Sequence, residues 1–115
     1  MSTVPTSVHA GAAQRWPSMS LMEQLAHVGS EVQRSIRAHE AGREDRLENA
    51  VARALELFDL SAADDRWRGP RRREILRARE EFCRLLYSDD AAPGSAASLQ
   101  NYFLAFATAA RRSRG

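Results

Sequence analysis

The chain of 115 residues is long enough for one compact domain with a modest core, so it needs neither disulfides nor a structural metal. Apolar residues make up 43% and charged residues 28% of the sequence, as in an ordinary globular protein. All 17 basic residues are arginine, yet the formal net charge is only +2. The overall charge therefore does not require a nucleic-acid partner, and any basic site must be local.

The single cysteine, Cys83, excludes an intramolecular disulfide and a cysteine-based zinc cluster. Its position beside an apolar stripe favours a small buried side chain over a reactive thiol. No apolar run approaches the roughly 18 to 20 residues that cross a bilayer, and no hydrophobic signal core follows the N-terminus. We therefore expect a soluble cytoplasmic protein that does not associate with membranes.

Residues 1–18 mix Ser, Thr, Ala, Gly and Pro without periodicity, which predicts a disordered tail. Trp16 is the one residue of this tail that would gain much from docking on the rest of the protein. Residues 19–115 are predicted to form a single helical domain.

The first predicted helix follows Ser20, which forms a capping box with Glu23: the serine oxygen satisfies an early backbone N–H and the glutamate reaches back. Gly29 lies beside the apolar stripe of this helix and costs roughly 1 kcal/mol relative to Ala. We therefore expect another helix to approach closely there, and we expect the helix to end at Gly42. The apolar stripe consists of Leu21, Leu25, Val28, Val32 and Ile36.

A helical hairpin over residues 47–86 is the element around which the chain is organised. Its first arm carries one broad apolar face. Its second arm begins with Pro70, which suits the first turn of a helix because a backbone N–H at that position has no hydrogen-bond partner within the helix. Arg79 projects into the apolar stripe of the second arm. It must therefore extend to solvent or pair with a carboxylate.

A last helix follows the loop that ends near Ser95 or Ser98, either of which would serve as its N-cap. Four amphipathic helices with no strand pattern predict an all-α protein, a four-helix bundle. The face that closes the core in this last helix carries Leu99, Tyr102, Phe103, Phe106, Ala107 and Ala110.

The strongest local charge lies in residues 66–84, which hold eight arginines and three glutamates. Guanidinium groups suit phosphates and carboxylates, and a tryptophan among them could anchor a protein partner or stack on a base. The three interpretations are a solvated, partly paired face, a protein-binding surface and a nucleic-acid site. The predicted partner-binding residues are Arg66, Trp67, Arg68, Arg71, Arg72, Arg73 and Arg77.

Glu23, His27 and Glu31 are spaced by four residues, as metal ligands on a helix would be. Their helical angles place them opposite the apolar stripe, so we expect all three to face solvent rather than a bundle interior. No metal site and no cofactor is predicted.

Arg34 and His39 fit a pattern of Arg, four residues and His. This pattern resembles the catalytic signature of HEPN-type helical ribonucleases, and the resemblance implies that Arg34 and His39 act on an RNA phosphodiester. Ser35 stands where an Asn or Asp usually follows the arginine. The enzymatic alternative is accordingly a ribonuclease, or a nucleotidyltransferase-associated helical subunit.

A broader resemblance covers residues 20–112. It is to a family of small bacterial and archaeal helical proteins without an established activity, and it rests on the segments SLMEQLAHVGSEVQRSI, RALELFDLSAADDRWRG, RREILRAREEFC and SLQNYFLAFATAAR. The resemblance implies a self-contained domain and leaves the function open. We therefore expect a small non-enzymatic protein–protein interaction module or a homodimer, with nucleic-acid binding through residues 66–77 as an alternative.

Overall fold

A computed structural model of the chain describes residues 14–114, with side chains up to residue 112. Within this range the protein is all-α and contains no strand, which confirms the predicted four-helix bundle. The elements in chain order are η1 (Trp16–Ser18), α2 (Leu21–Glu40), α3 (Glu44–Ala62), η2 (Asp65–Trp67), α4 (Pro70–Tyr87) and α5 (Ser95–Arg114).

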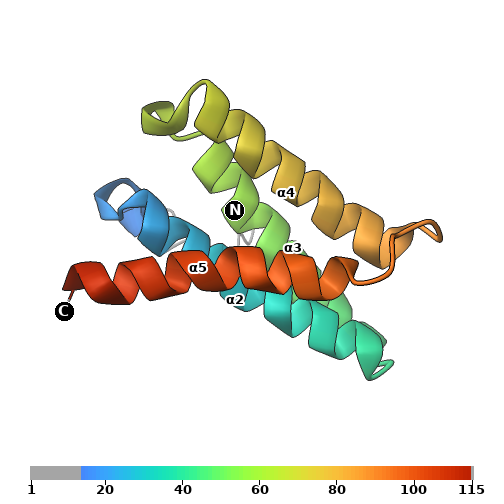
Figure 1. Cartoon of the computed structure of the whole chain (residues 1–115). Helices are drawn as coiled ribbons and strands as arrows, with labels where there is room; N and C mark the ends of the chain where they lie inside the picture. Colours follow the sequence, from blue (N-terminus) through green and yellow to red (C-terminus); the bar gives the residue numbers. More distant parts are fainter. Residues whose placement is uncertain (1–13, 115) are drawn as a thin grey trace, which may run out of the picture.

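Helix α2 is the centre of the bundle, because it packs closely against both α3 and α5. Helix α4 lies along α3, and α5 crosses in front of α2 (Figure 1). Helices α4 and α5 contact each other much less than α2 contacts its neighbours. One side of the bundle is therefore more open than the other.

The core is centred on Phe58 of α3, which is fully buried. Its ring centroid lies 5.8 Å from that of Phe82 on α4 and 5.9 Å from that of Phe103 on α5. Such tilted and edge-on pairs contribute beyond the area that they bury. Phe58 thus joins three of the four helices in one apolar cluster.

The helix ends follow the local signals in the sequence. Ser20 Oγ accepts a hydrogen bond of 3.1 Å from the Glu23 N–H, and Glu23 Oε1 accepts one of 2.9 Å from the Ser20 N–H, so the predicted capping box is confirmed. Pro70 is the first residue of α4, as predicted. Helix α5 begins at Ser95 itself, one residue earlier than a Ser95 cap implies, and the Ser95 hydroxyl donates back to the Ala92 carbonyl.

The predicted close approach at Gly29 is also confirmed, and the neighbour is α5. A Cβ atom built on Gly29 would lie 2.6 Å from Phe103 Cβ, which is closer than two carbon atoms can pack. Glycine is therefore what allows α5 to cross α2 at this point.

The N-terminal prediction needs a correction at Trp16–Ser18. These residues form η1, and Trp16 is only 3% exposed, because its ring packs against the core and its Nε1 donates to Ser61 Oγ of α3 at 3.2 Å. The ordered chain thus begins before residue 19. Residues 1–13 of the predicted tail lie outside the described part of the chain.

The prediction that Glu31 faces solvent is also wrong, because Glu31 is buried at 7% exposure. Since α2 packs against both α3 and α5, a wider arc of its surface is covered than its apolar stripe alone suggests. His27 is exposed, as expected. Among the described residues, no three His, Cys, Asp or Glu side chains gather as metal ligands would, and no helix is both long and apolar enough to span a bilayer.

Candidate functional site

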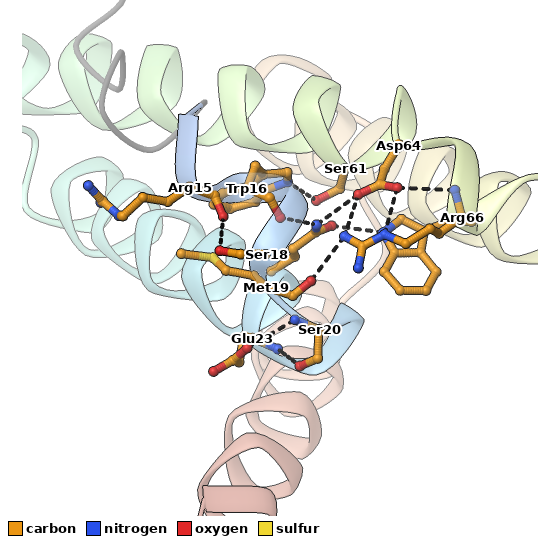
Figure 2. Close-up of polar contacts among 11 residues, drawn as sticks. Arg15, Trp16, Ser18, Met19, Ser20, Glu23, Ser61, Asp64 and Arg66 are labelled. Atoms are coloured by element: carbon orange, nitrogen blue, oxygen red, sulfur yellow. Dashed lines mark hydrogen bonds and ion pairs between the residues drawn. The ribbon is translucent and has the colours of Figure 1, made fainter.

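The arginine-rich segment begins with a polar network that ties η2 to α2 (Figure 2). At its centre is the fully buried Gln24, which lies on the core side of α2. The Gln24 amide nitrogen donates 3.0 Å hydrogen bonds to the Trp16 carbonyl and to Asp64 Oδ2, and its Oε1 accepts a 2.9 Å bond from Trp67 Nε1. Both polar atoms of the buried amide are thus engaged, as burial requires.

Asp64 and Arg66 form the outer part of this network. Arg66 Nε lies 3.0 Å from Asp64 Oδ1 and Arg66 Nη2 lies 2.7 Å from Oδ2, a two-pronged pairing, while Nη2 also donates to the Met19 carbonyl at 3.0 Å. These hydrogen bonds hold the pKa of Asp64 well below its usual range and raise the pKa of Arg66. The Arg66 guanidinium also lies 4.6 Å from the centre of the Trp67 ring.

Four of the seven predicted partner-binding residues therefore form hydrogen bonds within the fold. Arg66 and Trp67 belong to the network, and Trp67 is half-buried against the core. Arg72 Nε donates a 2.6 Å hydrogen bond to the Ala62 carbonyl, one of the last carbonyls of α3. Arg68 is exposed and makes only a long 3.3 Å bond to the Asp65 carbonyl.

Arg71, Arg73 and Arg77 are the exposed remainder of this set. None of them forms an ion pair with a described carboxylate. Arg71 lies near the pair in which Tyr102 Oη donates to Glu74 Oε1 at 3.0 Å; burial, followed by this bond, raises the pKa of Tyr102. Arg73 and Arg77 lie on the solvent side of α4.

The solvent side of α4 also carries two exposed apolar side chains that the sequence did not single out. Leu76 is 44% exposed and Tyr87 is 65% exposed. At about 100° per residue, both share one side of the helix with two of the unpaired arginines. The exposed pair of Arg84 and Glu80, with Nη2 and Oε2 4.0 Å apart, lies on the same side of the helix. We call this surface the α4 face and name it by its apolar side chains and unpaired arginines, Arg73, Leu76, Arg77 and Tyr87.

A cleft of about 640 Å³ separates α4 from α5 and borders the α4 face. Leu85, Leu99 and Tyr102 give it an apolar part. Its charged lining residues are Arg77, Arg84, Glu74, Glu81 and Asp90. The cleft exists because α4 packs mainly on α3 and only sparsely on α5. It is open to a side chain or a short segment of another molecule.

Arg79 has the structural role expected from its position. Its Nε lies 3.0 Å from Asp59 Oδ1, so it pairs with a carboxylate of α3 across the α3–α4 interface. It is thus turned away from the α4 face.

Arg34 and His39, the residues of the ribonuclease-like pattern, both lie exposed on α2. Five residues apart on one helix, they point about 140° away from each other. Arg34 pairs with Glu31 at 3.1 Å and lines a groove between α2 and α3, and His39 does not line that groove. The two side chains are thus not brought together in this groove.

Comparison with known proteins gives no relative: no protein family, no curated protein and no solved structure has a detectable match to this chain.

Proposed function

We propose that this protein is a small non-enzymatic interaction module of the cytoplasm, which binds a partner protein through the α4 face. The observation that carries the proposal is the exposure of Leu76 beside two arginines without a carboxylate partner. Among the described residues, the exposed large apolar side chains are Leu76, Tyr87 and Leu104, and two of these three belong to the α4 face.

The composition of the α4 face is typical of protein-binding surfaces. Tyrosine and arginine are enriched at interfaces and at their energetic centres. Residues 73 to 87 span about 21 Å along the helix, enough to contact two turns or more of a partner element. Since neither Arg73 nor Arg77 forms an ion pair within the described residues, the partner that suits this face offers acidic groups around an apolar side chain.

Nucleic-acid binding is the second candidate, and the same unpaired arginines favour it. A nucleic-acid surface of this kind combines basic groups with aromatic rings that stack on bases. The ring predicted for that role is Trp67, whose Nε1 is bonded to Gln24 and whose face is covered by Arg66. The exposed Leu76 fits a protein partner better than a nucleic acid, because its side chain has no group that could bind a phosphate or hydrogen-bond to a base edge.

The experiment is a comparison of Leu76→Asp with Leu104→Asp, a matched change of an exposed leucine on α5. Each protein carries a tag and is incubated with extract of its own host at physiological salt, and retained proteins are quantified. We expect a protein that is retained by the wild type and by Leu104→Asp, and is lost with Leu76→Asp. Retention of the same proteins by all three chains would refute the proposal.

The charge-reversal variant Arg73→Glu/Arg77→Glu tests the acidic character of the partner. We expect the same protein to be lost, with helicity by circular dichroism unchanged, because neither arginine has an ion pair to break. If the face instead binds a second copy of this chain, the purified wild type should sediment as a dimer and the charge-reversal variant as a monomer. Retention of RNA rather than protein by the wild type would favour the second candidate.

A further inference from the structure

A second basic site lies at the other hairpin of the bundle, where α2 turns into α3. A groove of about 430 Å³ is lined there by five arginines and an asparagine, with three alanines between them. No acidic residue lines it. The polar lining residues are Arg34, Arg37, Arg43, Arg46, Asn49 and Arg53.

Four of the five arginines in this groove have no ion pair with any described carboxylate. Arg34 alone has one, with Glu31. The arrangement of α3 explains this: at about 100° per residue, Glu44, Asp45 and Glu48 lie on one flank of the helix, while the arginines lie on the other. These three acids of α3 are therefore on a different side of the helix from its arginines.

Like charges around one small volume repel each other unless an anion lies between them. Guanidinium groups bind phosphate oxygens through paired N–H donors, and several around one groove can hold several phosphate groups at once. A volume of about 430 Å³ falls within the range of small-molecule sites, roughly 300 to 1,000 Å³. The alanines leave the arginine donors unobstructed, and Asn49 adds both a donor and an acceptor.

We infer that the α2–α3 groove binds a small anion that carries two or more linked phosphate groups, such as an oligophosphate or a nucleoside triphosphate. The site is distinct from the α4 face and does not depend on the proposed function. Five arginines around one volume exceed what a single phosphate group can engage, so affinity should rise with the number of phosphates.

The test is isothermal titration of the purified chain with orthophosphate, pyrophosphate and tripolyphosphate at physiological salt. We expect the dissociation constant to fall in that order, and Arg37→Ala/Arg46→Ala to weaken tripolyphosphate binding by roughly tenfold or more. Neither arginine has an ion pair, so the fold should persist in this variant. Arg73→Ala/Arg77→Ala on α4 is the matched control and should bind as the wild type does.

A lysine variant and two further ligands complete the test. Arg37→Lys/Arg46→Lys keeps the charge and removes the paired donors, so it should bind more weakly than the wild type if the guanidinium geometry matters. If ATP binds more tightly than tripolyphosphate, the site is assigned to a nucleotide. If the two bind equally, it is assigned to a free oligophosphate. Absence of tripolyphosphate binding, or equal weakening in the α4 control, would overturn the inference.

Discussion

Trp67 Nε1 donates a 2.9 Å hydrogen bond to Oε1 of Gln24, a residue 43 positions earlier in the chain. This bond fastens the start of the arginine-rich segment to the first long helix. It shows that the tryptophan has a structural role, and for this reason we place the proposed binding surface on the solvent side of α4 rather than on the loop.

Gln24→Ala should destabilise the protein by about 2 to 4 kcal/mol, because three buried or half-buried polar partners lose their hydrogen bonds at once. Chemical denaturation at neutral pH measures this change. Gln33→Ala is the control, since Gln33 is an exposed glutamine of the same helix and its change should stay within about 0.5 kcal/mol. Equal effects of the two substitutions would contradict the role given to Gln24.

Gly29→Ala should destabilise the protein by about 1 to 3 kcal/mol although alanine is the better helix former, because the added methyl group would lie 2.6 Å from Phe103 Cβ. Thermal unfolding followed by circular dichroism shows directly whether the substitution raises or lowers the stability. Ser30→Ala, at the neighbouring exposed position, is the control and should be almost neutral. A stabilised Gly29→Ala chain would show that α5 does not approach α2 as described.

Asp64 predicts a pH dependence of the free energy of unfolding. Its pKa is lowered in the folded protein, so its contribution is fully present above the unfolded value of about 4 and is lost as the pH falls through the folded value. Between pH 7 and pH 3 the wild type should therefore lose more stability than Asp64→Asn. Asp65→Asn, an exposed neighbour, should follow the wild type. Parallel losses in all three chains would contradict the pairing of Asp64 with Arg66.

The sequence predicts the fold well where the signal is local. The Ser20 capping box, Pro70 at a helix start and Gly29 beside an apolar stripe each act within one or two turns, and each lies where its local chemistry puts it. The burial of Gln24 and Glu31 is harder to predict, because it depends on packing against other parts of the chain: Gln24, for example, bonds to Asp64 and Trp67, about 40 residues later.

The candidate sites are less predictable for the same reason. Consecutive arginines in residues 66–77 look like one patch in sequence, but the helix turns Arg72 toward α3 and Arg73 toward solvent. Conversely, the arginines of the α2–α3 groove come from two helices and are interleaved with acids along the chain. The turn of α3 places its acids on the other flank of the helix, and the packing of the hairpin brings Arg37 and Arg46 to one groove.

The most direct test of the proposed function is photo-cross-linking in living host cells, with a benzophenone amino acid placed at position 76 or, as the matched control, at position 104. Both positions hold exposed leucines, one on the α4 face and one on α5. We predict a covalent adduct with another protein from position 76 and none from position 104. No adduct at position 76, or the same adducts from both positions, would contradict the assignment of the α4 face as the binding surface.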